Sequence, residues 1–151
     1  TSSKGDPVDE NTVLITSSSS IKYFQIPTSD DPILTWMEVR KGKFPNVTND
    51  TSGMKNVTVG EPVTLLVFFK DPTGLYNIRI PDCWAFERTN ILLSKYKLHL
   101  NGEKKRKKIL SEWRKGTVGD EEKFLYATFA SFKFPDKDQV FVACDVEVRI
   151  E

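Results

Sequence analysis

Histidine and cysteine are scarce in this sequence, and this limits the chemistry that the chain can carry. Its 151 residues include one histidine, His99, and two cysteines, Cys83 and Cys144. The cysteines do not fit the common four-ligand zinc spacings, and a single imidazole adds little to them. We therefore expect no metal centre and no cofactor. A disulfide is the simplest use of the two cysteines.

Catalytic motifs are absent from the sequence as well. It contains no G-x-S-x-G nucleophile elbow, no glycine-rich phosphate loop and no H-E-x-x-H. His99 lies in an alternating segment beside leucines, where a structural histidine is much commoner than a general base. The acid pairs at residues 30–31 and 121–122 fall in turns, where solvated charge is expected. The sequence therefore predicts a protein that is not an enzyme.

Neither sign of charge dominates. The chain has 22 Lys and Arg against 21 Asp and Glu, so its overall field favours no nucleic-acid partner. No apolar run reaches the length of about 18 residues that spans a bilayer, and the N-terminus lacks the basic and apolar regions of a signal peptide. We expect no membrane insertion by this segment, and we expect any targeting signal or anchor to lie outside it.

Three N-x-S/T sequons crowd into residues 46–58, at Asn46, Asn49 and Asn56. Sequons receive glycan only on the secretory route. Together with the cysteines they predict a secreted protein or the ectodomain of a membrane-anchored one. Residues 41–59 are polar and contain glycine and proline, so we expect one exposed loop that holds all three sequons, with a short edge strand over 54–59.

Short apolar segments between turns predict strands. Residues 140–148 alternate, which is typical of a half-buried strand and turns Cys144 toward the core. Residues 63–70 are apolar on both faces and predict a central strand covered on both sides. Two further strands are expected at 33–40 and at 124–129, the second continued by 132–134 past a bulge.

The remaining segments are less regular. Residues 76–80, after the turn at 71–74, predict the second strand of a hairpin that leads to Cys83. Residues 91–100 predict a strand, with a helix as the alternative, 109–113 are ambiguous, and 116–122 predict a loop. Seven or eight short strands indicate an all-β sandwich, in which Cys83 and Cys144 join the two sheets or two neighbouring strands.

The N-terminal stretch differs in composition from the rest. Residues 1 to about 20 are rich in Ser, Thr, Asp and Gly, apart from Val13-Leu14-Ile15, and a short apolar stretch at 21–26 follows. Such composition predicts a flexible linker or interdomain segment over residues 1–30. The sandwich domain is then expected over residues 31–151.

Five successive basic residues form the strongest local charge, namely Lys104, Lys105, Arg106, Lys107 and Lys108. The simplest interpretation is a solvated loop tip. The alternatives are a patch that binds an acidic protein or a glycosaminoglycan, and a protease site. Glu103 stands where a furin-type protease prefers arginine, which argues against the last alternative.

Four motifs, in the same order, resemble the C-terminal half (ZP-C) of a zona pellucida (ZP) module. They are Gly60-Glu61-Pro62-Val63, Asp82-Cys83-Trp84-Ala85, the segment 127–136, and Cys144-Asp145-Val146-Glu147-Val148. The sequence is most similar to invertebrate ZP proteins of apical extracellular matrices, over residues 33–151. The resemblance implies an immunoglobulin-like antiparallel β-sandwich, and it matches Cys83 and Cys144 to family positions that pair in some ZP-C domains.

The sequence departs from the family at two positions. Glu103 and Arg149 stand where the family usually carries a further pair of cysteines, so we expect their side chains to lie close together at the surface. The ZP-N half, the cleavage site and the hydrophobic propeptide are also missing. We therefore interpret the sequence as an excised domain, or as a divergent relative that does not polymerise.

The resemblance implies a non-enzymatic extracellular structural or interaction module that supports or regulates ZP polymer assembly. Its partners would be the ZP-N half and other ZP modules. The alternative is a receptor-type or soluble module that binds an extracellular protein ligand or a glycan and does not polymerise.

The basic run yields a prediction that depends on charge alone. Replacing the lysines of residues 104–108 by serine should lower the salt concentration at which the secreted protein elutes from heparin, since exposed cation contacts are screened well below about 1 M salt. Elution that is unchanged by these substitutions would argue against an acidic partner at this run.

Overall fold

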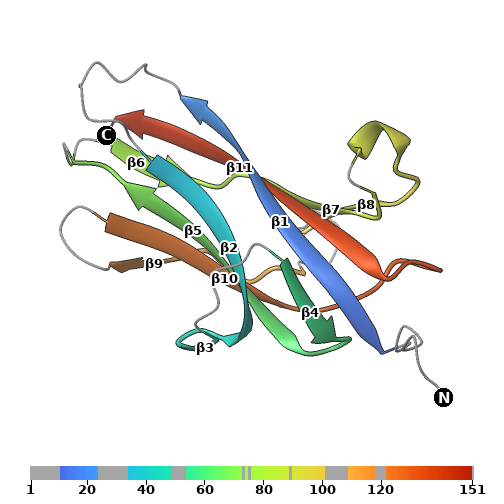
Figure 1. The fold of residues 1–151 in the computed structure, drawn as a ribbon. Coiled ribbons are helices and arrows are strands. Elements are labelled where there is room, and N and C mark those ends of the chain that lie inside the picture. Colours follow the sequence, from blue (N-terminus) through green and yellow to red (C-terminus); the bar gives the residue numbers. More distant parts are fainter. Residues whose placement is uncertain are drawn as a thin grey trace.

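The computed structural model of the chain is a sandwich of two β-sheets (Figure 1). It describes residues 11–23, 34–48, 54–72, 74, 76–88, 90–100, 109–117 and 122–150. The described part is strand-rich, with one short 3-10 turn, η1 (Ile91–Leu93). The all-β sandwich expected from the sequence is therefore confirmed. None of the described residues forms a helix long and apolar enough to cross a membrane.

One sheet has six strands. Their bounds are β1 (Thr12–Tyr23), β4 (Met54–Thr58), β6 (Tyr76–Arg79), β7 (Cys83–Phe86), β8 (Lys97–His99) and β11 (Gln139–Ile150). The order is β4-β1-β11-β7-β8, and β6 also pairs with β11. The long strand β11 therefore lies in the middle of this sheet. β1 pairs along one edge of β11, and β7 followed by β6 pairs along its other edge.

The other sheet has five strands. Their bounds are β2 (Leu34–Lys43), β3 (Asn46–Val47), β5 (Pro62–Lys70), β9 (Arg114–Thr117) and β10 (Glu122–Ala130). The order is β3-β2-β5-β10-β9, so β5 is central, as expected. The predicted strands at 33–40 and 124–129 are confirmed as β2 and β10.

The core lies between the two sheets. β5 contributes Val63, Leu65 and Val67, and β11 contributes every second residue from Val140 to Val148. All of these side chains are buried. The alternation of residues 140–148 therefore reports the burial of one face of β11, as expected for a period of two.

β1 overturns the expectation of a linker for residues 12–23, which lie within the predicted segment 1–30. This strand pairs in parallel with β11 and antiparallel with β4, and Val13 and Ile15 are buried in the core. The serines at 17–20 pair with β11 although their composition is typical of a linker, because the hydrogen bonds of a strand come from the backbone. Residues 1–10 and 24–33 lie outside the described part.

The hairpin expected after β5 is also wrong. β6 pairs with β11 in the opposite sheet, and not with β5. Both edges of β5 are already occupied by β2 and β10. The buried carboxylate of Asp71 accepts a hydrogen bond from the backbone N–H of Tyr76 at 2.9 Å, which fixes the segment as it crosses to the other sheet.

Three further segments differ from expectation. Residues 91–100 combine the 3-10 turn η1 with the short strand β8, and β9 extends into the loop expected at 116–122. Residues 132–134 do not continue β10. Phe134 is instead buried in an irregular segment, where its ring stacks on Tyr96 at 5.9 Å, so its alternation with Phe132 reflects packing and not a strand.

Cys83 and Cys144 form a disulfide. They are directly opposite one another in β7 and β11, with Cα atoms 4.1 Å apart, and both are fully buried. Of the two arrangements left open by the sequence, the bond joins neighbouring strands of one sheet and does not bridge the two sheets.

Removing this disulfide should destabilise the domain strongly. The variant with Cys83→Ala and Cys144→Ala should lose up to roughly 4 kcal/mol of unfolding free energy, because the bond closes a loop between residues 61 apart and restricts the unfolded chain. Urea unfolding under non-reducing conditions measures the loss. As a control, a reductant should destabilise the parent chain and leave the variant unchanged. A loss below about 1 kcal/mol would contradict this role.

Candidate functional site

The outer face of the five-stranded sheet carries a second apolar cluster, which we call the aromatic face. It consists of the buried Leu66, Phe68 and Phe124 and the half-buried Trp36, Phe44 and Tyr126. The outward face of an antiparallel sandwich sheet is usually polar and solvated. A cluster of this kind therefore marks a surface with a specific use or a specific cover.

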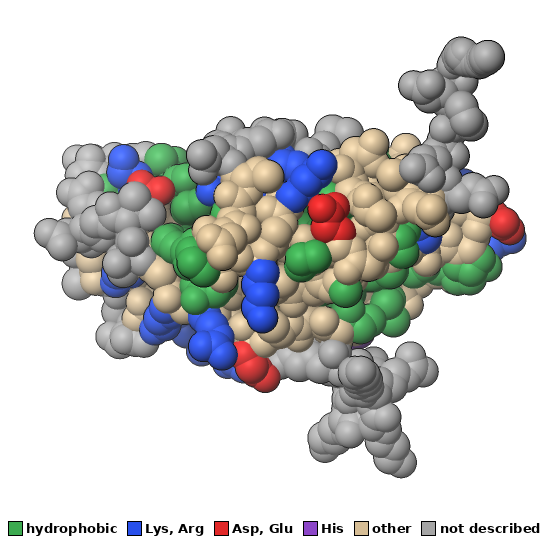
Figure 2. Space-filling model, turned by 90° about the horizontal axis from the view of Figure 1, so that it is seen from below, with side chains coloured by type: hydrophobic (Ala, Val, Ile, Leu, Met, Phe, Trp, Pro, Cys, Tyr) green, Lys and Arg blue, Asp and Glu red, His purple; other side chains and the backbone are tan. Residues whose placement is uncertain are grey.

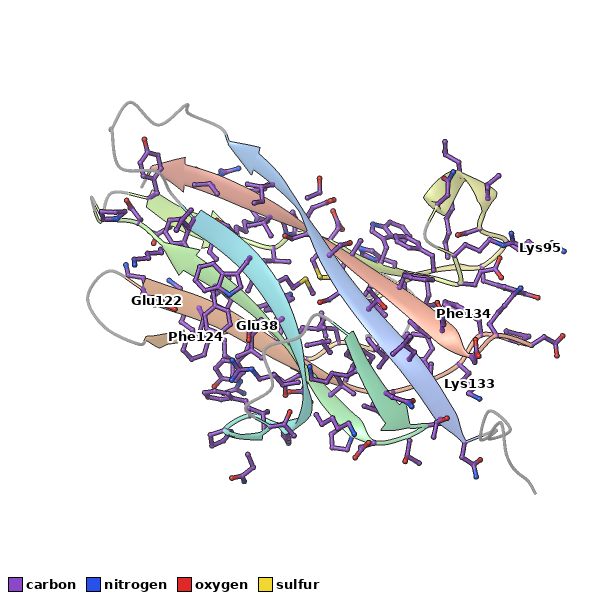
Figure 3. The ribbon with its side chains drawn as sticks, viewed as in Figure 1. Glu38, Lys95, Glu122, Phe124, Lys133 and Phe134 are labelled. Atoms are coloured by element: carbon purple, nitrogen blue, oxygen red, sulfur yellow. A yellow bond between two sulfur atoms is a disulfide. The ribbon has the colours of Figure 1, made fainter. Side chains whose placement is uncertain are left out.

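Strand register brings the aromatic face together. Trp36 of β2, Phe68 of β5 and Phe124 of β10 are cross-strand neighbours. Trp36 stacks on Phe68 at 5.1 Å, and Phe68 lies 5.5 Å from Phe124. Figure 3 labels Phe124 of β10 and Glu38 of β2, which comes two residues after Trp36. Aromatic pairs at such distances stabilise a sheet beyond the area that they bury.

The turn between β2 and β3 lays Phe44 across this face. Its ring lies 4.3 Å from Tyr126 and 5.5 Å from Phe124. The backbone N–H of Phe44 donates to the hydroxyl of the fully buried Thr64, at 3.2 Å, and this hydroxyl donates to the carbonyl of Gly42, at 2.8 Å. One buried threonine thus anchors both sides of the turn.

Gly42 is required by the same turn. Its φ of 104° lies in the left-handed region, and a Cβ at this position would collide with the carbonyl oxygen of Asn46. Any side chain at residue 42 would therefore push β3 away from β2. The position of Phe44 over the aromatic face depends on this glycine.

A largely buried ion pair, Glu38 and Arg40, lies beside Trp36 and Phe68 on the aromatic face. The Glu38 carboxylate accepts hydrogen bonds from the Trp36 indole N–H at 2.9 Å and from the Arg40 guanidinium at 2.6 and 3.1 Å. The same guanidinium lies 5.8 Å from the centre of the Phe68 ring. Because the charge of Glu38 is matched by Arg40, this part of the face presents no net charge to a ligand.

A cleft of about 330 Å³ opens beside Phe44, and we call it the Phe44 cleft. Its lining consists of Lys43, Phe44, Ser111, Arg114, Tyr126 and Thr128. Lys43 and Arg114 are exposed, and neither forms an ion pair with another residue of the described part. The view from below shows Lys and Arg side chains beside hydrophobic ones on the molecule (Figure 2). The cleft therefore offers aromatic rings, hydroxyls and two cations together.

Two of the three sequon asparagines, Asn46 and Asn56, lie on strands of different sheets, so the expectation of one loop that holds all three sequons is wrong. Asn46 is exposed in β3, at the edge of the five-stranded sheet, and Asn56 is exposed in β4, at the edge of the other. The edge strand expected over 54–59 is confirmed. Asn56 points outward because its neighbours Lys55 and Val57 are buried. Asn49 lies outside the described residues.

Of Glu103 and Arg149, which stand where the resembling family carries a further pair of cysteines, the structure describes Arg149. Arg149 is exposed on the face of β11 opposite Cys144, as expected, and its guanidinium lies 3.2 Å from the Glu147 carboxylate. Glu103 and the basic run 104–108 lie outside the described part. Proximity of Glu103 to Arg149 therefore stays a prediction.

His99 of β8 lies against Asp82 and Trp84. Its Nε2 lies 2.7 Å from the Asp82 carboxylate, and its ring contacts Trp84 at 4.6 Å. Its buried Nδ1 has no hydrogen-bond partner within the described part of the chain. Among the described residues, no three His, Cys, Asp or Glu side chains come together as a metal site.

Comparisons with known proteins leave the family open. No protein-family model, curated protein or solved structure matches this chain. The likeness to ZP-C thus depends on the four motifs quoted above. The structure shows which of those motifs lie next to one another, and it separately reveals the aromatic face.

Gly116 yields a test of the aromatic face. The Phe124 ring lies over this residue of β9, so the methyl group of Gly116→Ala would collide with it. We expect a loss of about 1–3 kcal/mol, the usual cost of overpacking, together with a changed near-ultraviolet circular dichroism spectrum. Lys115→Ala, at the next, exposed position of β9, is the control and should stay within about 0.5 kcal/mol. Equal effects would contradict the contact.

Proposed function

We propose that the chain is a non-enzymatic extracellular structural and interaction module, similar to the ZP-C half of a ZP module, which supports or regulates assembly of a ZP polymer. The pairing of β7 with β11 is the observation that supports this most. It places the motif Asp82-Cys83-Trp84-Ala85 beside the motif at 144–148 and joins them by a disulfide. Two segments selected for their likeness to one family thus form one structural unit.

The other two motifs also meet in space. The backbone N–H of Gly60 donates to the carbonyl of Ser131, at 2.9 Å, and the N–H of Ser131 donates to the carbonyl of Glu61, at 3.0 Å. Val63 and Phe129 are cross-strand partners in β5 and β10. The motif at 60–63 therefore contacts the segment 127–136, so the four motifs form two pairs, one in each sheet.

The cysteines and the sequons support the proposed compartment. A fully buried disulfide between central strands is typical of proteins that fold in an oxidising environment. The exposed side chains of Asn46 and Asn56 are accessible for glycosylation. Both features support an extracellular module.

The Phe44 cleft favours a second function, a receptor-type or soluble binding module that does not polymerise. Two cations that have no ion-pair partner among the described residues lie beside aromatic rings, and together they suit a ligand with oxygen-rich, partly apolar groups. The two functions differ in self-association, which can be measured.

The test is the size of the secreted protein. The chain should be expressed together with the flanking sequence of its natural precursor, and its mass followed by light scattering after size exclusion at increasing concentration. We expect concentration-dependent polymers, and none when Cys83 and Cys144 are replaced by serine. A monomer at every concentration would favour the binding module. Free thiols in the secreted material, detected by mass spectrometry, would contradict both functions.

A further inference from the structure

We propose that the first sugars of a glycan on Asn46 pack against Phe44 and occupy the Phe44 cleft. The chain's own glycan then covers the part of the aromatic face formed by Phe44 and Tyr126. This inference rests on the proposed extracellular function, because only the secretory route attaches the glycan. It gives the Asn46 sequon a structural role that the other sequons do not share.

Strand register directs Asn46 toward the cleft. Asn46 of β3 is the cross-strand partner of Lys43 of β2. Directly opposed residues of an antiparallel pair project from the same face, with Cβ atoms about 4.5–5.5 Å apart. Lys43 lines the cleft. The exposed Asn46 side chain therefore leaves the hairpin on the cleft side, where an attached sugar starts at its rim.

Phe44 is held in place to receive this sugar. It precedes Asn46 by two residues, and its ring rests on Tyr126 while remaining half-buried. The hydrogen bonds to Thr64 fix the backbone of the turn. A pyranose ring presents a face of C–H groups, and such a face packs on an aromatic ring. Since the platform is fixed before the sugar arrives, little additional ordering is needed.

The rest of the cleft suits the polar edge of the same sugar. The lining also includes Ser111, Thr128 and Arg114, where the Ser111 hydroxyl accepts a hydrogen bond from the Thr128 backbone N–H at 2.9 Å and the Thr128 hydroxyl lies 3.2 Å from that of Thr64. They can bond sugar hydroxyls and the carbonyl of an N-acetyl group. The volume of about 330 Å³ is at the small end of the roughly 300–1,000 Å³ range of ligand pockets, which fits one or two sugar residues.

The other sequons lack this arrangement. Two residues before Asn56 stands Met54, and two residues before Asn49 stands Val47, so neither has an aromatic ring at the matching position. Asn56 is opposite Leu14 of β1, in the other sheet. The Asn56 sequon is therefore an internal control with the same chemistry and a different surface.

The experiment compares two variants of the protein secreted from mammalian cells, after glycopeptide mass spectrometry has confirmed occupancy of both sites. Asn46→Gln should lower the melting temperature by about 2–4 °C, whereas Asn56→Gln should leave it unchanged. Trimming the glycans enzymatically to a single N-acetylglucosamine should preserve most of the difference. In protein made in bacteria, which lacks glycan, both substitutions should have no effect.

A spectroscopic measurement tests the contact without any substitution. In protein with ¹³C-labelled N-acetylglucosamine, the first sugar at Asn46 should show protons shifted upfield by the Phe44 ring, and the first sugar at Asn56 should not. Equal melting shifts for the two variants, or unshifted signals at an occupied Asn46, would overturn the inference. So would an empty Asn46 beside an occupied Asn56, and that result would leave the proposed function intact. Secreted protein without any glycan would count against the proposed function itself.

Discussion

The six-stranded sheet depends on the pairing of β11 along both of its edges. β1 occupies one edge, and β7 and then β6 occupy the other, so three strands from distant parts of the chain share one partner. The alternation of buried residues fixes the register of β11. A slip by one residue would expose Cys144 and the buried valines of this strand, and it would bury Asp145 and Glu147. The disulfide then joins β7 to β11 at the point where two of the four motifs of the ZP-C resemblance meet.

Strands that carry their own hydrophobic pattern were predictable from the sequence, and strands that depend on distant partners were not. β11 was identified from the period of its apolar residues, and β5 from a short run that is apolar on both faces. β1 was missed because residues 17–20 are serines, although Val13, Ile15 and Ile21 have even spacing and pack on one side. The hairpin after β5 was wrong because a local turn signal does not reveal that both edges of β5 are taken.

The candidate site shows the same division. Cys83, Cys144 and the three sequons could be identified by composition and short motifs, since these depend on few residues. The aromatic face could not, because Trp36, Phe44, Phe68 and Tyr126 come from separate segments and meet only through strand register. Its one signal was the apolar character of both faces of β5, which predicted a cover without showing that Phe44 supplies part of it.

The parallel pairing of β1 with β11 also determines how the domain resists force. The N-terminal end of β1 and the C-terminal end of β11 lie at opposite ends of the sandwich (Figure 1). Tension between them loads the ladder from Leu14–Gln139 to Tyr23–Val148 in shear, so its hydrogen bonds must break together and not one at a time. The covalent link between Cys83 and Cys144, which are 61 positions apart, keeps the segment between them from extending even after the ladder has broken. The architecture is that of a mechanical clamp between these two ends of the chain.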